Sequence, residues 1–455
     1  MNLTIMRFGR TSLTDINAYN KVLEIIDQHK DSKLIFVVPA VPEITELLEQ
    51  STLKAERHED VNSILQTIQN KHNQIIHSVF SEYQVHLLEE FLQDNLEKIK
   101  EKLKDIQEFG ISSYKTNFVL SFGELFSTYI LSNFLLTNDC DVEYISANNL
   151  IVVGENGLPM MDVTTRKIQE AIIPLLEKNI IPIISGSIGR NKEGHITSLG
   201  PGGNDLTATI LADSLQKDPY LVKVIFWEPI QGIMTADPEI EPSAKLIENL
   251  SYAQAKEIAY FGAKVLHPRC IQHIQYKEIP LEIRDITDLT REKCTKISKL
   301  GEKGPDVKGI VYIDEVAMIS AISEALVEVP GTLAKLFGLM GENNINITMV
   351  SQSSSEINTT FVVDKKDGDK AVNVIRNSDF FRRWFVVNLQ IVAEIAIIGE
   401  GLGQPDILGK VFSGLGQKKI NVLAISQASG GLNISILVPK EQLKNSIKAI
   451  HQCFL

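Results

Sequence analysis

The sequence predicts an α/β protein in which a mainly parallel sheet sandwiched by helices is followed by two ferredoxin-like α+β domains. Three observations predict this class. The chain opens with strand, helix and strand patterns over residues 3–38, which is the βαβ unit of a parallel sheet. The same rhythm resumes after residue 110. Beyond residue 309 one pattern occurs twice, and self-similarity at a fixed period marks a repeated unit.

The first elements are an apolar strand over 3–8, an amphipathic helix over 13–30 and a buried strand over 34–38. Residues 56–110 differ from them. They are charged, lack proline and carry apolar residues at helical spacing, which predicts a helical hairpin inserted into the α/β domain. We expect this pair of helices to be a solvated addition without chemistry of its own.

The remaining α/β elements follow in regular order. Residues 287–308 lack a clear period and form a plausible boundary, so we expect domains over 1–295, 309–385 and 389–455. The expected strands cover 117–122, 142–147, 180–185, 221–226 and 279–286, and the expected helices cover 125–136, 165–178, 205–216 and 251–261.

The repeat is the clearest organisational feature. Residues 333–363 match residues 408–438 at a constant offset, so that Phe337 corresponds to Phe412 and Asn358 to Asn433. Each copy reads strand, helix, strand, strand, helix, which is a βαββαβ-type unit. One copy alone leaves part of a small sheet uncovered, so we expect the copies to pair side by side, within a chain or across a dimer.

Composition excludes several classes of protein. The 455 residues are 44% hydrophobic and 22% charged, which is typical of a globular chain, and the net charge of −12 disfavours nucleic acid and anionic membranes as partners. No apolar run reaches the ~18 residues of a membrane span. The start of the chain lacks a signal-peptide pattern, and the four cysteines form no C-x-x-C pair. We therefore expect a soluble cytoplasmic protein.

Three loops with glycine or hydroxyl residues suggest a ligand site. They cover residues 7–12, 200–207 and 233–238, and none is a P-loop. Loops at the carboxyl ends of parallel strands meet at one edge of the sheet, where α/β proteins bind ligands. Glu124 is expected at the end of the strand over 117–122. The pattern favours an anionic nucleotide together with a small polar substrate.

Five stretches of the chain resemble the aspartokinases. NLSYAQAKEIAYFGAKVLHPR (249–269) and GIMTADPEIEPSAKLI (232–247) carry the most specific likeness. IMRFGRTS, LSFGE and GPGGNDLTA resemble three further motifs of that family. The repeat is similar to tandem ACT regulatory domains, and VSQSSSEINTTF is closest to the threonine-sensing branch, which includes the aspartokinase–homoserine dehydrogenases. Because the sequence stops at Leu455, we expect no homoserine dehydrogenase domain.

The resemblance implies an amino acid kinase that transfers phosphate from ATP, with Mg²⁺, to the side-chain carboxylate of aspartate. It also implies feedback by threonine or lysine and assembly into a homodimer or homotetramer through the ACT domains. The implied catalytic residues are Arg7 and Asp205; the substrate residues are Arg10, Thr45, Glu124, Gly202, Gly203 and Asn204; the nucleotide residues are Gly9, Thr11, Ser12, Trp227, Glu228, Met234, Asp237, Glu239, Lys264 and Val265; and the effector residues are Asn346, Ile347, Gln352, Asn421 and Gln427. No metal-ligand cluster is expected.

Several site positions depart from the family pattern. Arg7 stands where the family has lysine, and Pro201 stands where an arginine is expected to clamp the substrate carboxylate. The other changes are Pro39 for serine, Asn204 for serine, Trp227-Glu228 for Thr-Asp, Met234 for tyrosine and Glu239 for arginine. A proline makes no bidentate carboxylate contact, and a glutamate near phosphate reverses the sign of the local field.

These departures leave alternatives open. Arg10 either replaces the cation lost at Pro201 or is an exposed arginine. The chain is then an active aspartate kinase, a kinase for a related amino acid, or a catalytically impaired amino-acid sensor. The glutamines and asparagines of the repeat either bind an effector or satisfy local backbone groups. We expect the two copies to differ as effector sites, because Gly430-Gly431 stands where the first copy has Ser355-Glu356.

Overall fold

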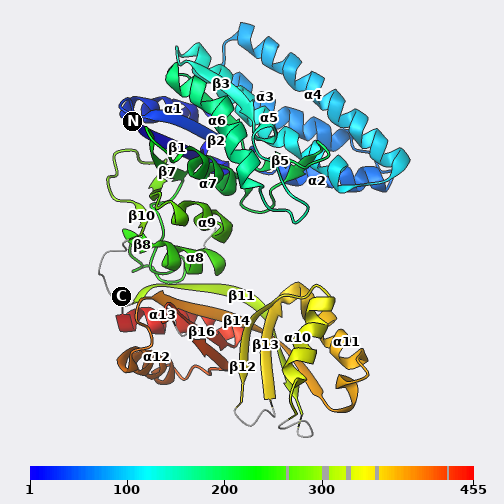
Figure 1. Cartoon of the computed structure of the whole chain (residues 1–455), viewed down its shortest axis with the longest axis vertical. Helices are drawn as coiled ribbons and strands as arrows, with labels where there is room; N and C mark the ends of the chain where they lie inside the picture. The colour runs from blue at the N-terminus through cyan, green and yellow to red at the C-terminus, as the bar shows by residue number, and fades with distance from the viewer. Residues whose placement is uncertain (263–265, 300–306, 324–328, 354–357, 428–429, 455) are drawn as a thin grey trace. The chain divides into compact units, whose positions relative to one another are not determined.

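The protein is described by a computed structural model that divides into two compact units (Figure 1). Each unit has its own sheet and its own hydrophobic core. The first unit contains residues 1–233, 248–252 and 265–301, and the second contains residues 234–247, 253–264 and 302–455. The residues that the structure describes are 1–262, 266–299, 307–323, 329–353, 358–427 and 430–454.

The first unit is built on an eight-stranded sheet in the order β3-β4-β2-β1-β7-β9-β10-β8. Neighbouring strands pair in parallel except β9 and β10, which pair antiparallel. The strands are β1 (Asn2–Phe8), β2 (Lys33–Val38), β3 (Val142–Ser146), β4 (Ile181–Ser185), β7 (Leu221–Glu228), β8 (Asn249–Ser251), β9 (Leu281–Asp285) and β10 (Thr295–Ser298). A separate hairpin pairs β5 (Ile188–Arg190) with β6 (Ile196–Ser198).

Helices cover both faces of this sheet, as the sequence predicts. One face carries α1 and α5 with α2, α3 and α4 packed around them, and the other carries α6, α7 and α9. The expected hairpin range 56–110 contains α3 and α4. The helices are α1 (Ile16–Gln28), α2 (Ile44–Glu56), α3 (Asn62–Val79), α4 (Glu82–Phe109), α5 (Ser113–Thr137), α6 (Met161–Glu177), α7 (Gly203–Leu215) and α9 (Pro268–Tyr276). Helix α8 (Tyr252–Tyr260) belongs to the second unit, apart from Tyr252.

One predicted strand is wrong. Residues 117–122 are helical and belong to α5, which runs without a break through the range expected for a separate helix over 125–136. A short continuous apolar run does not distinguish a buried strand from a buried helix. Gly123 does not end the helix; it permits close packing, because a Cβ there would lie 3.0 Å from the Cβ of Ala40. Glu124 therefore lies in the middle of a helix. The short strand β10 falls in the range 287–308, where no period was detected.

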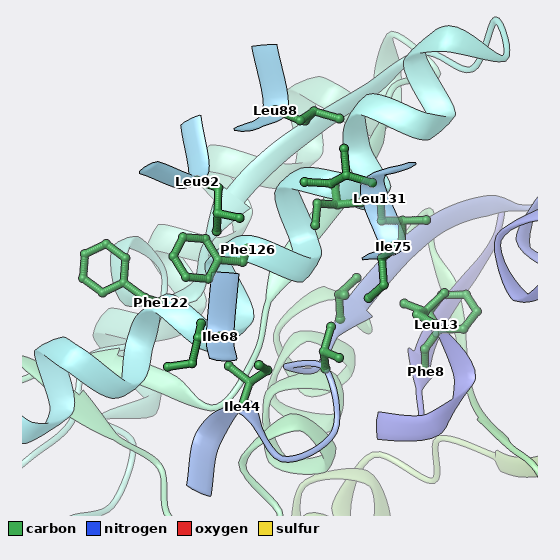
Figure 2. Packing of buried hydrophobic residues seen from close by; sticks show 14 of the residues in the cluster. Phe8, Leu13, Ile44, Ile68, Ile75, Leu88, Leu92, Phe122, Phe126 and Leu131 are labelled. Carbon is green, nitrogen blue, oxygen red and sulfur yellow. The ribbon is translucent and has the colours of Figure 1, made fainter. Parts of the chain in front are cut away.

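The helical layer forms the largest part of the first core. Figure 2 shows Phe122 and Phe126 of α5 beside Ile68 of α3 and Leu92 of α4. By length and mean hydropathy (1.3), α5 is the one helix among the described residues that could span a membrane, but 67% of its apolar window is buried inside the protein. The apolar composition of α5 is therefore that of a central core helix. All four cysteines lie in described segments and are free.

The second unit contains the repeat in one six-stranded antiparallel sheet of order β12-β13-β11-β14-β16-β15. The copies therefore pair side by side within the chain. The first copy contains β11 (Val307–Ile322), α10 (Thr332–Glu342), β12 (Ile347–Gln352), β13 (Asn358–Asp364) and α11 (Gly368–Asn377). The second copy contains β14 (Val386–Gly399), α12 (Pro405–Gln417), β15 (Ala424–Gln427), β16 (Asn433–Val438) and α13 (Leu443–Phe454).

The two copies share their long strands. Among the described residues, the first half of β11 pairs only with β14, and after an irregularity between Ile313 and Val316 the second half lies between β13 and β14. Each copy is thus a strand–helix–strand–strand–helix unit with three strands, and the long strand of the other copy takes the place of the fourth strand of a βαββαβ unit. A small core formed by Val316, Met349, Val362, Val392 and Leu437, with Leu423 and Ala424 beside it, draws on all six strands or the residues next to them.

Candidate active site

Arg7 is the centre of a buried charged cluster in the first unit. Met6 and Phe8 of β1 pack into the helical core, so strand alternation turns Arg7 to the opposite face, where α7 begins. There its Nη2 lies 2.8 Å from Oδ1 of Asp205, and its Nη1 pairs with the Glu228 carboxylate at the end of β7. The guanidinium also lies 4.1 Å over the ring of Phe226.

Charge balance in this cluster favours a permanently ionised arginine. Burial opposes the charge on Arg7, but the Asp205 and Glu228 carboxylates outweigh that effect and raise the pKa of the guanidinium. Burial raises the pKa of Asp205, and the attraction of Arg7 offsets part of that rise. Among the described residues, the cluster holds one positive group and two carboxylates, so Arg7 already has two anionic partners.

The loop after β1 is closely joined to the end of β7. The Gly9 N–H donates to the carbonyl of Trp227 at 2.8 Å, and the hydroxyl of Ser12 donates to the same oxygen at 3.3 Å. A Cβ at Gly9 would lie 2.4 Å from Oε2 of Glu228, so the Glu228 carboxylate occupies the space beside this glycine and would have to move to admit a side chain. Thr11 is exposed. The indole N–H of buried Trp227 has no hydrogen-bond partner among the described residues.

The glycine-rich loop before α7 is held by residues 267–269. Gly202 has a φ of 70°, and a Cβ there would lie 2.3 Å from the Cβ of His267. The His267 N–H donates to Oδ2 of Asp205 at 3.1 Å, and Nη1 of Arg269 donates to the Leu199 carbonyl at 3.1 Å. The conformation of the loop and the position of Asp205 therefore depend on this segment.

A second polar group surrounds Glu124 in the middle of α5. Burial raises the pKa of Glu124 to about 7, and hydrogen bonds from its own backbone and from the Ser187 hydroxyl, with the charge of Arg10, partly offset that rise. Ser187 follows β4 and has a φ of 64°, a strained conformation for a non-glycine residue. Arg10 donates to Oε1 of Glu46 at 2.7 Å, and both side chains are half exposed.

Two polar atoms beside this group lack partners. Among the described residues, no hydrogen bond reaches the buried Oγ1 of Thr45 or the buried Oδ1 of Asn204. Thr45 precedes Glu46 on α2. Asn204 lies against Gly186, and a Cβ added at Gly186 would be 1.8 Å from Oδ1 of Asn204. Buried polar atoms without partners are costly, which suits groups that complete their hydrogen bonds with a ligand.

The site thus collects most of the residues expected in the first unit. Arg7, Gly9, Asp205, Trp227 and Glu228 form one cluster, which we call the arginine cluster. A second set, which we call the glutamate group, contains Arg10, Thr45, Glu124 and Asn204. Contacts through Glu46 and residues 186–187 join its members. Gly203 links the two, since a Cβ there would lie 2.8 Å from the Cα of Ser187.

Comparisons with known proteins agree with this arrangement. The model of the amino acid kinase family matches residues 2–285, and that of the ACT domain matches residues 319–378 and 395–454. The chain belongs to the amino acid kinase family. The matched kinase residues contain both the arginine cluster and the glutamate group, and the ACT matches fall on the two copies of the repeat.

Relatives of this amino acid kinase are aspartokinases. The bifunctional aspartokinase/homoserine dehydrogenase of Buchnera aphidicola is 30% identical, over 99% of this chain and 56% of its own length. The chloroplastic one of Daucus carota is 27% identical, over 99% of this chain and 50% of its length. The chain spans about half the length of these curated relatives.

Solved aspartokinases share the fold. E. coli aspartokinase III in complex with aspartate and ADP has a TM-score of 0.83 at 24% identity, with 99% of each chain covered. The aspartate kinase of Clostridium acetobutylicum has a TM-score of 0.80 at 21% identity, with all of each chain covered.

The other nucleotide residues expected in this amino acid kinase lie elsewhere in the chain. Lys264 and Val265 lie outside the described residues. Met234, Asp237 and Glu239 belong to the second unit. There Asp237 accepts a hydrogen bond from the Tyr312 hydroxyl at 2.8 Å, and its other oxygen accepts one from the Glu239 N–H at 2.9 Å.

The first ACT copy contains a cavity of about 580 Å³. It lies at the start of α10, whose N-terminus has no side-chain cap, so its N–H groups suit an anion. The Oγ of Ser323, a residue that is 3% exposed, has no partner among the described residues. Asn346 and Ile347, at the other end of β12, are not among the described lining residues, which include Ser323, Val329, Gly331, Leu336, Gln352, Thr359 and Phe385.

At the matching position of the second copy, the described residues pack against one another. Leu402 is fully buried, and its N–H donates to the Gly431 carbonyl at 2.9 Å. The amide of Gln427 lies against Gly403, where a Cβ would be 3.2 Å from Nε2. The Asn421 N–H donates to the side chain of Gln442 at 2.9 Å. The two copies therefore differ in the space beside their glutamines.

Sequence reasoning missed Glu46, Ser187 and His267 as members of the site. Ser187 carried a weak signal, because it follows the predicted strand over 180–185 directly after Gly186. His267 lies in the segment that resembles the aspartokinases, but only its backbone contact with Asp205 shows what it does. Glu46 carried no signal, since acids on exposed helix faces are common.

Proposed function

We propose that this amino acid kinase phosphorylates the side-chain carboxylate of L-aspartate, or of a related amino acid, with ATP. The observation that carries the proposal is the pairing of the buried arginine cluster with the glutamate group at the carboxyl edge of one parallel sheet. The first offers a fixed cation for phosphate, and the second offers a carboxylate, a cation and two unpartnered polar atoms for a small zwitterion.

The glutamate group fits the two charged ends of an amino acid. In its ionised form the Glu124 carboxylate pairs with the substrate ammonium group. Arg10 leaves its exposed partner Glu46 and pairs with the substrate α-carboxylate. This pair takes the place of the carboxylate contact that Pro201 cannot make. Thr45 and Asn204 complete their hydrogen bonds on the bound substrate. Unchanged substrate affinity in Arg10→Gly would contradict this role.

The arginine cluster serves the nucleotide. In the transfer, a substrate carboxylate oxygen forms a bond to the γ-phosphorus while the bond from the γ-phosphorus to the β–γ bridging oxygen breaks, giving an acyl phosphate and ADP. Arg7 stabilises the negative charge on the phosphoryl oxygens. Residues 267–269 keep Asp205 and the glycine-rich loop in place during the transfer.

The residues present fit Mg²⁺ held mainly by the nucleotide. No group of three His, Cys, Asp or Glu side chains that could hold a metal occurs in the described segments. Mg²⁺ characteristically takes one or two protein carboxylates together with substrate phosphates. Asp205, in the first turn of α7, is the carboxylate that would hold it, and the ion would neutralise charge on the transferred phosphoryl group.

The decisive test is acyl-phosphate formation by the purified protein with Mg²⁺ and ATP. Hydroxylamine traps the product as a hydroxamate across a panel of amino acids that includes aspartate. Hydroxamate with aspartate supports the proposal, and hydroxamate with another acid alone assigns that acid as substrate. Folded protein that forms none with any acid favours the alternative, a regulatory amino-acid sensor, which the departure at Pro201 supports.

We also propose that the cavity of the first ACT copy binds an amino-acid effector, threonine or lysine. The uncapped start of α10 suits the effector carboxylate, and Ser323 and Gln352 offer hydroxyl and amide groups. Assembly into a homodimer or homotetramer through the ACT domains remains a prediction.

Paired variants test the effector site. Gln352→Ala should raise the effector concentration for half-maximal inhibition at least tenfold, whereas Gln427→Ala should change it less than twofold, because Gln427 lies against its own loop. Equal losses in the two variants, measured as inhibition curves for threonine and lysine, would refute the difference between the copies.

A further inference from the structure

Glu228 lies where the proposed nucleotide site is expected to bind phosphate. Its carboxylate is paired with Arg7, the cation that the proposed function gives to the phosphoryl group. It also lies against Gly9, the glycine of the loop after β1, where the space for a Cβ is filled by Oε2 at 2.4 Å and Cδ at 2.8 Å. The glycine loop and the arginine are therefore both in contact with an anion supplied by the chain.

The charges of the cluster make this arrangement stable without a ligand. Asp205 holds one side of the Arg7 guanidinium and Glu228 holds the other, with side-chain exposures of 12% and 18%. Phe226 packs on the face of the guanidinium. Among the described residues, a phosphate that approaches Arg7 meets two carboxylates and one cation, so these three groups disfavour it until one carboxylate leaves.

Glu228 is the carboxylate that is able to leave. Asp205 is held by α7 and by the His267 N–H. Glu228 is the last residue of β7 and has a longer, more flexible side chain. Among the described residues, only Arg7 donates a hydrogen bond to the side chain of Glu228. Rotation of Glu228 away from Gly9 would free both the Arg7 Nη1 and the space beside the glycine.

We propose that the Glu228 carboxylate is an internal competitor of the nucleotide phosphate, and that nucleotide binds only when Glu228 leaves Arg7 and Gly9. This inference rests on the proposed function, since it concerns the same nucleotide site. It assigns Glu228 as a residue that lowers nucleotide affinity. It also explains how the chain keeps the glycines of the phosphate site while a carboxylate occupies that site.

The test measures MgADP affinity in the full-length chain. Glu228→Gln keeps the shape of the side chain and removes its charge, and Glu228→Ala also vacates the space beside Gly9. We expect MgADP to bind at least tenfold more tightly to Glu228→Gln than to wild type, and at least as tightly to Glu228→Ala. Glu282→Gln is the matched control: Glu282 lies on β9 of the same sheet with Lys223 and Arg284, and MgADP affinity should not change.

Trp227 provides a direct optical readout. The chain has two tryptophans, and in a Trp384→Phe background the emission reports the residue next to Glu228. Titration calorimetry on the same proteins gives the affinities independently. Near-UV circular dichroism confirms that each variant is folded.

The outcomes separate this inference from the proposed function. Equal MgADP affinity in wild type, Glu228→Gln and Glu228→Ala overturns the competitor role. Weaker binding in both variants overturns it as well and makes Glu228 a ligand of the bound Mg–nucleotide. Tighter binding in both variants, with no hydroxamate formed from any amino acid by wild type or variants, supports the competitor role while the proposed kinase reaction fails.

Discussion

Ionisation of Glu124 is expected to control substrate binding between pH 6 and pH 8. The carboxyl is buried in the middle of α5, and its pKa is raised to about 7 from an ordinary value of 4.5. If the ionised form binds the substrate ammonium group, the proton must leave before the amino acid binds. About one-tenth of the sites are ionised at pH 6 and about nine-tenths at pH 8, so the KM for aspartate should fall about tenfold over this range.

The same group changes the stability of the protein with pH. Between pH 4.5 and pH 7 the folded chain keeps the Glu124 proton that the unfolded chain has lost. The folded state therefore binds more protons, and its free energy of unfolding decreases as pH rises through this window. Above pH 7 the raised pKa of Glu124 lowers the free energy of unfolding by about 3 kcal/mol, at 1.36 kcal/mol per pKa unit. Glu124→Gln should lose this part of the pH dependence.

The assay is hydroxamate formation with aspartate varied at each half pH unit, combined with urea unfolding of the same proteins. Ser187→Ala removes a hydrogen bond that favours the ionised carboxyl, so the midpoint of the KM change should move to higher pH. Glu97→Gln, an exposed acid on α4, should leave the profile unchanged. A wild-type KM that is constant from pH 6 to pH 8 would refute the reasoning.

Three further predictions concern single side chains. Gly186→Ala places a Cβ 1.8 Å from Oδ1 of Asn204, so it should raise the KM for the amino acid at least tenfold in steady-state kinetics. His72 is fully buried and its pKa is lowered to about 4, so below pH 6.5 the unfolded chain binds a proton that the folded chain does not, and the free energy of unfolding decreases as pH falls. His72→Leu should therefore move the midpoint of acid unfolding, measured by circular dichroism, to lower pH. Burial raises the pKa of Glu394 to about 7, so Glu394→Gln should raise the free energy of unfolding by about 3 kcal/mol at pH 8 and little at pH 5.

Much of the arginine cluster could be predicted from local sequence. The strand over 3–8 followed by Gly9 indicated a loop at the carboxyl edge of a parallel sheet, and the glycines before Asp205 indicated a helix start. The partner of Arg7 could not be predicted in this way. Glu228 lies 221 residues away in the chain, and only the parallel pairing of β1 with β7 brings the two strand ends together.

The glutamate group was only partly predictable. The resemblance pointed to Glu124 and Thr45, but residues 117–122 were assigned to a strand because an apolar run has the same composition in a buried helix. The error matters for chemistry: a carboxyl at a strand end would face the loops, whereas one in the middle of a core helix is buried. That burial is what raises the pKa of Glu124 to about 7.

The sequence by itself determined the parallel α/β unit, the duplicated βαββ pattern and the residue types available to the site, because these follow from the period of apolar residues and from turn chemistry within short windows. Only the tertiary structure decided the partners. Sheet order brought Glu228 to Arg7, packing of α5 buried Glu124, and shared long strands joined the two ACT copies into one sheet. Contacts between distant segments depend on which faces bury one another, and that depends on the whole chain.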